Sequence, residues 1–150
     1  MAPFERRLRA ARKAARHPRI LVSDIERRLG VTYTAETLSR IKRLYPRVRF
    51  VWLMGADNLE QISEWKDWER VFASLPIAVF DRPAYGERAL GSAAARHFAD
   101  KRIDASRAAS LADRRPPAWI FFPGRLSAAS ATGIREGGAV PAGEAAEGAE

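Results

Sequence analysis

The chain has 150 residues, 47% of them hydrophobic and 29% charged, which is the composition of one ordinary globular domain. It has no cysteine, so disulfide bonds, zinc-thiolate sites and a cysteine nucleophile are excluded. Its net charge of +8 raises the question of nucleic acid, but Lys and Arg are spread along the chain without interleaved aromatic residues. A basic surface that attracts small phosphorylated substrates explains the charge equally well, and we expect no nucleic-acid partner.

The N-terminal segment is predicted to be a helix that leads into a strand. Phe4, Leu8, Ala11 and Ala15 recur at helical spacing, which favours an amphipathic helix over a transit peptide despite the many arginines. No apolar run approaches the roughly 20 residues that span a bilayer. We therefore expect a cytoplasmic protein with no membrane partner.

Four short apolar or β-branched runs are predicted to be strands. They cover residues 19–24, 48–54, 76–80 and 118–122. Each is largely apolar on both faces, as the buried strands of a parallel sheet are.

Longer segments of helical spacing separate these runs. Leu38, Ile41 and Leu44 indicate a helix after the first strand, with Thr34 as its N-cap. Residues 59–73 are predicted to form one or two short helices, and residues 87–111 a helical excursion rich in alanine. This alternation predicts an α/β fold with a parallel sheet. Residues 136–150 lack large apolar side chains and are predicted to form a disordered acidic Gly/Ala/Glu tail.

Four local signals stand where a parallel sheet binds its ligands, at strand carboxyl ends and at the helix starts beyond them. The first is the sequence TYTAETL at residues 32–38. Free backbone amides and Thr hydroxyls at a helix start suit a carboxylate or a phosphate. Taken alone, this segment is more often only a helix cap at Thr34.

The second signal is the sequence GADNL at residues 55–59, directly after a predicted strand. Gly55 permits a ligand to approach the backbone closely, and the carboxylate of Asp57 suits ribose hydroxyls or a metal-bound water. The alternative is that Asp57 caps the next helix.

The third signal is the sequence WKDW at residues 65–68, which is predicted to lie in a short helix. An exposed Trp65 suits stacking on a flat heteroaromatic ring. Aromatic residues three apart are, however, more often part of the core.

The fourth signal is the sequence SATGIR at residues 130–135, after the last predicted strand and a Pro-Gly turn. The hydroxyls of Ser130 and Thr132 at a helix start, with Arg135 one turn on, form a cradle of triphosphate size. The alternative is a capped helix with an incidental arginine.

In this order and at these separations, the four signals resemble the nicotinate-nucleotide adenylyltransferase family of the nucleotidyltransferase superfamily. Its members carry a TYT-x-x-TL segment, a GxDN-L segment, a W-x-x-W or W-x-x-Y pair and a late S-x-T-x-I-R. The resemblance extends from about residue 6 to residue 135. It implies a partial nucleotidyltransferase domain over residues 1–135, with a Rossmann-like, doubly wound parallel sheet.

The resemblance also implies a reaction and a set of site residues. The family transfers AMP from ATP to nicotinate mononucleotide with the help of Mg²⁺, giving nicotinate adenine dinucleotide and pyrophosphate in NAD biosynthesis. Thr34 and the backbone of Ala35 would bind the nicotinate carboxylate. Trp65 would stack on the pyridine ring, and the amide of Lys66 would complete the carboxylate site. The ATP site would consist of Gly55, Asp57, Ser130, Thr132 and Arg135.

The chain departs from the family pattern at both ends. Members begin with a strand and a G-x-F-x-P-x-H-x-G-H segment that contacts the transferred phosphate, and they continue into a helical segment after the residue that matches Arg135. Neither His17 nor His97 belongs to such a segment, so both are expected at the surface and no catalytic residue is assigned.

The same departure affects the expected sheet. The family order is 3-2-1-4-5, and strands 1 and 2 would be missing. Residues 19–24 would then lie across a gap from residues 48–54, unless the two strands pair directly. We expect the 150-residue chain by itself to be poorly stable, because central strands would lack ladder partners, and to have no adenylyltransferase activity.

Several alternatives stay open at this point. A noncatalytic nucleotide-binding or basic interaction module on the same fold is the main one. A nucleic-acid binder rests on charge alone, and an enzyme acting on phosphopantetheine fits the aromatic pair less well. The sequence predicts no resident metal site, and it leaves open a homo-oligomer and the choice between nicotinate and nicotinamide.

Overall fold

The computed structural model describes residues 3–124, which fold into two compact units. The first unit ends at Val48 and the second begins at Arg49. The prediction of one partial domain over residues 1–135 extends beyond the described residues and stays a prediction. The tail predicted at residues 136–150 lies outside the described residues.

The described part of the first unit contains the helices α1 (Phe4–Ala14), α2 (Ile25–Leu29) and α3 (Thr34–Leu44). The amphipathic helix predicted from the N-terminal stripe is confirmed as α1. It is joined to α2 by an ion pair in which Arg27 donates to Glu5 at 2.8 Å. The sequence analysis missed α2, which ends at Gly30 in the left-handed conformation common at helix ends.

The strand predicted at residues 19–24 is wrong. A turn in which the Ile20 amide donates to the His17 carbonyl begins this segment, and residues 20–24 have no regular structure. Ile20 is 56% exposed and Leu21 is 89% exposed. A strand needs a neighbouring strand for its backbone groups, and no strand of the described residues pairs with this segment. Both expected arrangements, a strand separated from residues 48–54 by a gap and a strand paired directly with them, are therefore wrong, because residues 19–24 are not part of the sheet.

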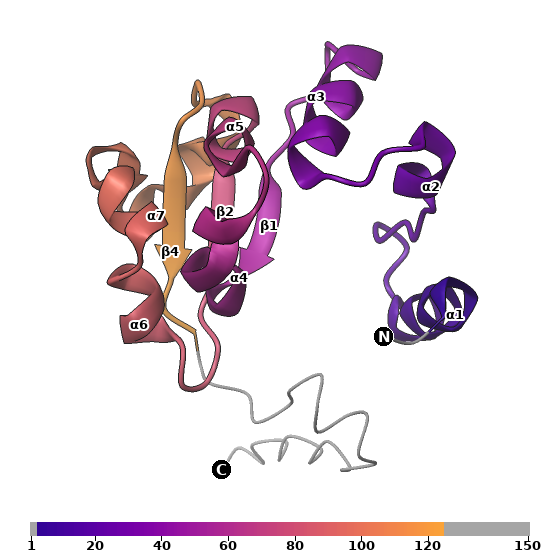
Figure 1. Cartoon of the computed structure of the whole chain (residues 1–150), viewed down its shortest axis with the longest axis horizontal. Coiled ribbons are helices and arrows are strands. Elements are labelled where there is room, and N and C mark those ends of the chain that lie inside the picture. The colour runs from indigo at the N-terminus through magenta and orange to yellow at the C-terminus, as the bar shows by residue number, and fades with distance from the viewer. Residues whose placement is uncertain (1–2, 125–150) are drawn as a thin grey trace, which may run out of the picture. The chain divides into compact units, whose positions relative to one another are not determined.

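The second unit is built on a parallel sheet of four strands within the described residues (Figure 1). They are β1 (Trp52–Gly55), β2 (Ile77–Phe80), β3 (Arg102–Ile103) and β4 (Trp119–Phe122), in the spatial order β1-β2-β4-β3. The α/β class with a parallel sheet is confirmed. Strands were predicted at residues 76–80 and 118–122, and the observed strands β2 and β4 each begin one residue later than predicted. The strand predicted from residue 48 begins only at Trp52, because the Val48 amide donates to the Tyr45 carbonyl in a turn.

The helical excursion predicted at residues 87–111 is interrupted by β3. This segment forms α6 (Gly86–Leu90), α7 (Ala93–His97), the 3-10 helices η2 (Ala99–Lys101) and η3 (Ala105–Asp113), and β3 between them. A strand of two residues is too short to give a periodic signal, so the prediction of helix across it was wrong.

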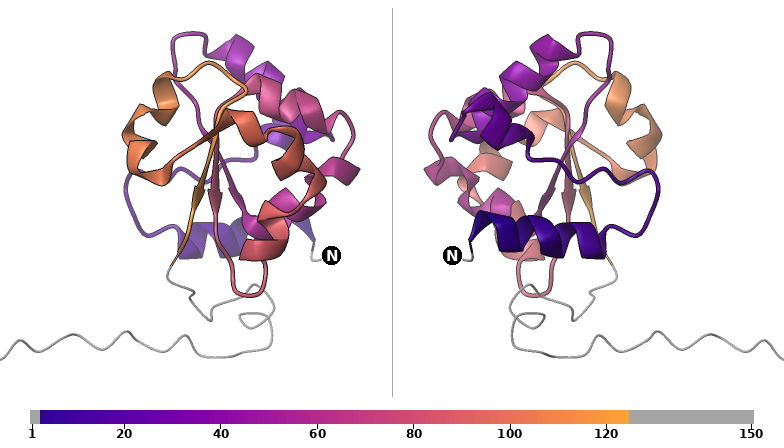
Figure 2. Two further views of the ribbon diagram at one scale, coloured as in Figure 1. Left: turned by 90° about the vertical axis from the view of Figure 1, so that its left-hand side faces the viewer. Right: turned by 90° about the vertical axis from the view of Figure 1, so that its right-hand side faces the viewer.

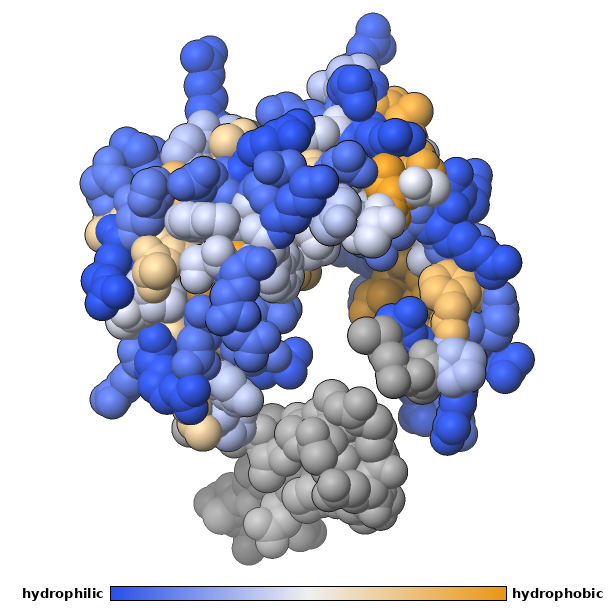
Figure 3. Space-filling model, viewed as in Figure 1, coloured by the Kyte–Doolittle hydropathy of each residue, from blue (hydrophilic) through white to orange (hydrophobic). Residues whose placement is uncertain are grey.

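Helices cover both faces of the sheet. The connection from β1 to β2 holds α4 (Ala56–Gln61), η1 (Ile62–Glu64) and α5 (Trp68–Ser74), which confirms the short helices predicted at residues 59–73. Helices α4 to α7 lie on one face and η3 on the other (Figures 1 and 2). Ala78 and Ile120 pack against Leu111 of η3, and the alternate positions Ile77, Val79 and Trp119 are fully buried on the opposite face. Hydrophilic residues cover most of the outer surface of α4 to α7 (Figure 3).

Candidate functional site

The turn from β1 into α4 is the most tightly built feature at the carboxyl end of the sheet. Gly55 ends β1, and α4 begins at the next residue. Gly55 is buried, and a Cβ placed on it would lie 2.5 Å from Nε of Arg82 and closer still to the carboxylate of Asp57. Its φ of −84° is open to any residue. A side chain at this position would therefore displace Asp57 and Arg82, although the backbone itself would accept one.

Asp57 forms an ion pair across this turn. Its Oδ1 lies 3.3 Å from Nε of Arg82, and the two side chains are 28% and 49% exposed. The alternative role of Asp57 as a helix cap does not hold, because Gly55 occupies the cap position of α4 and no side chain bonds there. Asp57 lies in the first turn, where the helix dipole favours a negative charge.

The sequence analysis did not single out Arg82. It comes two residues after β2, and Phe80 at the end of β2 is the register partner of Gly55 at the end of β1. Parallel neighbouring strands bring their carboxyl ends together. An arginine two residues after an apolar run was therefore the available signal, of the same kind that marked Gly55 and Asp57.

A cavity of about 370 Å³ opens beside this ion pair. The Asp81 carboxylate accepts a 2.7 Å hydrogen bond from the Arg82 amide. Gly86 has no space for a side chain, since a Cβ there would lie 2.7 Å from Asp81 Oδ1. The positive charges of Arg82 and Arg88 suit a phosphate or a carboxylate, and the acidic residues Asp81 and Glu87 lie beside them in the lining. The lining residues are Asp81, Arg82, Ala84, Gly86, Glu87 and Arg88.

A second cavity, of about 380 Å³, lies at the carboxyl ends of β3 and β4. The guanidinium of Arg102 lies over the rings of Trp119 and Phe121, 5.5 Å and 5.8 Å from their centroids. Hydrogen bonds from the side chain and the backbone amide of Ser106 hold the pKa of Asp104 below its usual value. Arg102, Asp104 and Phe121 all line this cavity. Both cavities thus lie at the edge of the sheet where parallel α/β proteins bind ligands.

Thr34 and Ala35 lie at the start of α3 in the first unit, as expected, but Thr34 is not the N-cap. It is the first helical residue, and Tyr33 occupies the cap position without a side-chain cap bond. The Thr37 hydroxyl donates to the Tyr33 carbonyl at 3.3 Å. The Glu36 amide donates to the Tyr33 carbonyl at 3.1 Å. The amides of Thr34 and Ala35, at the first two helical positions, have no carbonyl acceptor within the helix and are the donors that a carboxylate would need.

Trp65 and Lys66 do not lie in a helix, contrary to prediction. Trp65 follows η1 in an extended conformation, and Asp67 adopts φ = 53° before α5 begins. This left-handed residue separates the two helices. Of the aromatic pair, Trp68 is the one in a packed cluster, since its ring lies edge-on to Phe72 at 6.2 Å. Trp65 is half-buried, and Lys66 is exposed.

The structure thus brings Gly55 and Asp57 together and adds Arg82 to them. Thr34 and Ala35 belong to the first unit, whereas Trp65 and Lys66 belong to the second. The predicted phosphate-binding residues Ser130, Thr132 and Arg135 lie outside the described residues. His17 and His97 are both exposed.

Residues 3–124 contain no group of three or more His, Cys, Asp or Glu side chains placed to hold a metal ion. No helix in this range has both the length and the apolar character needed to cross a membrane.

Comparison with known proteins first gives the class. The family model described as cytidylyltransferase-like matches residues 1–137, and the parallel sheet with its cavities at the strand ends is the structure of such a domain in this chain. Three relatives are each named a probable nicotinate-nucleotide adenylyltransferase. The one from Ruegeria pomeroyi is 47% identical over 91% of this chain and 64% of its own length. Those from Cereibacter sphaeroides and Parvibaculum lavamentivorans are 48% and 49% identical, over 91% and 92% of this chain and 72% and 69% of their own lengths.

The chain belongs to the nicotinate-nucleotide adenylyltransferase family within this cytidylyltransferase-like class. It spans between 64% and 72% of the length of these three relatives. Among solved structures, a Plasmodium falciparum nicotinic acid mononucleotide adenylyltransferase, complexed with APC, has a TM-score of 0.52 and 17% identity. The match covers 81% of this chain and 53% of that one, and it shows a shared fold. The family resemblance and the Rossmann-like fold expected from the four motifs are confirmed.

Proposed function

We propose that the chain binds substrates for adenylyl transfer from ATP to nicotinate mononucleotide. In this reaction a phosphate oxygen of the mononucleotide attacks the α-phosphorus of ATP. A new P–O bond forms, the bond between the α-phosphorus and the bridging oxygen breaks, and pyrophosphate leaves. The observation that carries the proposal is the Gly55 turn with its Asp57–Arg82 pair, at the strand ends of a chain of this family.

The proposed roles of the substrate-binding residues come from the family resemblance and are compatible with the elements on which these residues lie. Thr34 and the amide of Ala35, at the start of α3, would take the nicotinate carboxylate. Trp65 would stack on the pyridine ring, and the amide of Lys66 would complete the carboxylate site. Both residues lie between η1 and α5, outside any helix.

The adenosine side is assigned to the β1–α4 turn. The missing side chain of Gly55 lets the ribose approach the backbone, and the Asp57 carboxylate would accept hydrogen bonds from ribose hydroxyls. The ion pair with Arg82 holds that carboxylate in place. Ser130, Thr132 and Arg135 would hold the ATP phosphates.

Mg²⁺ would enter with the triphosphate of ATP. Mg²⁺ is commonly held by one or two carboxylates together with substrate phosphates and water, so a dedicated protein cage is not required. Asp57 and Asp81 are the carboxylates near the β1 and β2 ends: Asp57 forms an ion pair with the Arg82 side chain, and Asp81 accepts a hydrogen bond from the Arg82 amide. Bound Mg²⁺ would neutralise charge on the phosphates during transfer.

The basic charge belongs to one part of the chain. Residues 1–48 hold 13 Lys and Arg against four Asp and Glu, whereas residues 49–150 hold 13 against 14. Such a surface attracts phosphorylated substrates, but it also suits the alternative of a basic interaction module. We propose a cytoplasmic enzyme without a nucleic-acid partner.

Calorimetric titration of the chain separately with nicotinate mononucleotide, ATP and a DNA oligomer tests this proposal. We expect saturable binding of both small ligands. Repeating each titration at about 50 mM and 200 mM salt identifies binding to a phosphate backbone, which falls steeply with salt. DNA binding tighter than that of either small ligand would favour the basic module instead.

Trp65→Ala should weaken nicotinate mononucleotide binding by about 1–3 kcal/mol, the scale of one aromatic stack. ATP affinity should hardly change, because the substitution leaves the β1–α4 turn intact. Titrating both ligands measures the difference. A variant that loses stability but binds the mononucleotide normally in its folded fraction would place Trp65 in the core.

Arg135→Lys should weaken ATP binding, because lysine lacks the planar two-pronged donor geometry of arginine. The expected loss is about 1.5–3 kcal/mol, the contribution of hydrogen bonds to a charged group. ATP titration and turnover in a full-length family member with the same motif provide the measurement. Unchanged values for both would remove Arg135 from the site.

A further inference from the structure

We propose that the ion pair between Glu60 and Arg88 positions α4, and through α4 the Asp57 carboxylate, at the carboxyl end of β1. Arg88 is then a positioning residue for the site. The placement of α4 follows from the contacts alone. The consequence for ligand binding rests on the proposed function of Asp57.

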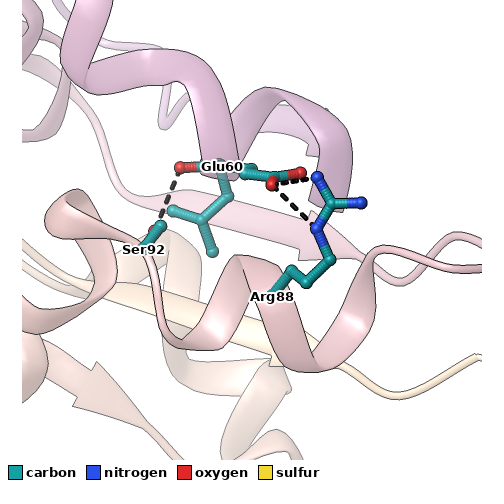
Figure 4. A network of polar contacts seen from close by, with 4 residues as sticks. Glu60, Arg88 and Ser92 are labelled. Atoms are coloured by element: carbon teal, nitrogen blue, oxygen red, sulfur yellow. Dashed lines mark hydrogen bonds and ion pairs between the residues drawn. The ribbon is translucent and has the colours of Figure 1, made fainter.

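The pair joins two helices with a two-pronged contact. Nε and Nη2 of Arg88, in α6, both donate to Oε1 of Glu60, in α4, at 3.0 Å and 2.6 Å (Figure 4). A planar guanidinium with two bonds to one oxygen constrains the relative position of the helices more than a single point charge would. Arg88 therefore fixes where the last turn of α4 lies relative to α6.

The carboxylate side of the pair is enclosed by the protein. The Glu60 side chain is 23% exposed and that of Arg88 is 67% exposed. Oε2 of Glu60 is buried and has no hydrogen-bond partner among the described residues. A partly buried carboxylate that loses its partner is strongly disfavoured, because its desolvation is no longer compensated. Without Arg88, Glu60 would have to turn toward solvent and displace α4.

A second anchor acts at the neighbouring residue of α4. Leu59 is fully buried, and its carbonyl accepts a 3.2 Å hydrogen bond from the Ser92 hydroxyl (Figure 4). The same hydroxyl accepts the Ala95 amide and caps α7. The carboxyl half of α4 is thus fixed to both α6 and α7.

The two ends of α4 are held by one segment of the chain. Asp57 and Glu60 are three residues apart, so they share one face of the helix. Arg82 and Arg88 both follow β2, and both line the 370 Å³ cavity. One arginine holds each carboxylate. A shift at Glu60 is therefore expected to change the geometry at Asp57, one turn away.

The alternative is an ordinary surface ion pair, which contributes little to stability. The chain offers a matched control in Arg70 and Asp67, whose nitrogen and oxygen lie 3.6 Å apart with side chains 59% and 44% exposed. The experiment compares Arg88→Met, Arg88→Lys and Arg70→Met with the unchanged chain. Hydrogen exchange measured by mass spectrometry on peptides over residues 55–61 reports the order of α4, with ATP and nicotinate mononucleotide titrations beside it.

We expect Arg88→Met to speed exchange in α4 about tenfold, as local opening becomes easier. ATP affinity should fall about tenfold while affinity for nicotinate mononucleotide stays the same. Arg88→Lys should recover part of both effects, and Arg70→Met should show neither. Unchanged exchange in α4, or an equal loss for both ligands, would overturn the positioning role. If the unchanged chain binds neither ligand, the proposed function fails, and the exchange data still decide whether Arg88 positions α4.

Discussion

Replacing Gly55 by alanine should weaken ATP binding by about 1.5–3 kcal/mol, which is the contribution of hydrogen bonds that involve a charged group. A Cβ at this position would lie 2.5 Å from Nε of Arg82 and would also collide with the Asp57 carboxylate. Both side chains have to move away, which breaks the ion pair and withdraws the carboxylate from the strand end. ATP titration of the folded variant measures the effect.

The loss of thermal stability in this variant should be smaller than the loss of affinity. The atoms in the way are the ends of two side chains that are 28% and 49% exposed, so they can relax toward solvent. Gly91→Ala is the matched control, because a Cβ there would meet its neighbours at 3.5 Å and 3.6 Å, which is ordinary contact. Equal ATP affinity for both variants would show that the space at Gly55 is not used by the ligand.

The turn at Gly55 shows what sequence reasoning could recover of the site. An apolar run followed at once by Gly-Ala-Asp indicates a strand end with a free carboxylate, and β1 ends at Gly55, one residue after the predicted end at Met54. The partner of that carboxylate was not recoverable, because Arg82 is 25 positions away and no local pattern connects the two. Glu60 and Arg88 are a second pair of this kind. Contacts between distant segments depend on strand register, which the sequence does not show directly.

The strands show the same difference between local features, which the sequence predicts, and contacts between distant segments, which it does not. Residues 76–80 and 118–122 were predicted well, because every position of β2 and β4 is apolar and all but the last residue of each strand are buried. Residues 20–22 are also apolar, yet Ile20 and Leu21 are exposed and unpaired with any strand of the described residues. An apolar run becomes a strand only where a neighbour satisfies its backbone groups. Its composition does not reveal whether such a neighbour exists.

The family resemblance depends on how the four motifs are arranged along the chain. Each of the four motifs also had a purely structural interpretation, as a helix cap or as part of the core. The structure supports the core interpretation for one member of the aromatic pair and excludes the cap interpretation for the first two motifs. Trp68 of the aromatic pair is indeed packed, whereas neither Thr34 nor Asp57 caps its helix through its side chain. Only the order and separation of the motifs identified the family.

Trp119→Ala should destabilise the second unit by about 3–5 kcal/mol, the usual loss when a fully buried large aromatic side chain is removed. Trp119 is 1% exposed in β4, and its indole N–H donates to the Phe98 carbonyl at 2.7 Å. The substitution leaves a cavity between the sheet and the α7 layer and also leaves that carbonyl without its donor. Urea denaturation followed by circular dichroism gives the free energy of unfolding.

Trp119→Phe separates the two contributions to this loss. It restores most of the packing but not the hydrogen bond, whose net worth is about 0.5–1.5 kcal/mol, so its stability should lie much nearer to the unchanged chain. Trp65→Ala is the informative comparison, since Trp65 is only half-buried and is proposed to contact the ligand. We expect Trp119→Ala to lower stability without changing mononucleotide affinity in the folded fraction, and Trp65→Ala to do the reverse. If both variants lose stability alike and bind alike, the tryptophans share a structural role, and the pyridine site has to be sought elsewhere.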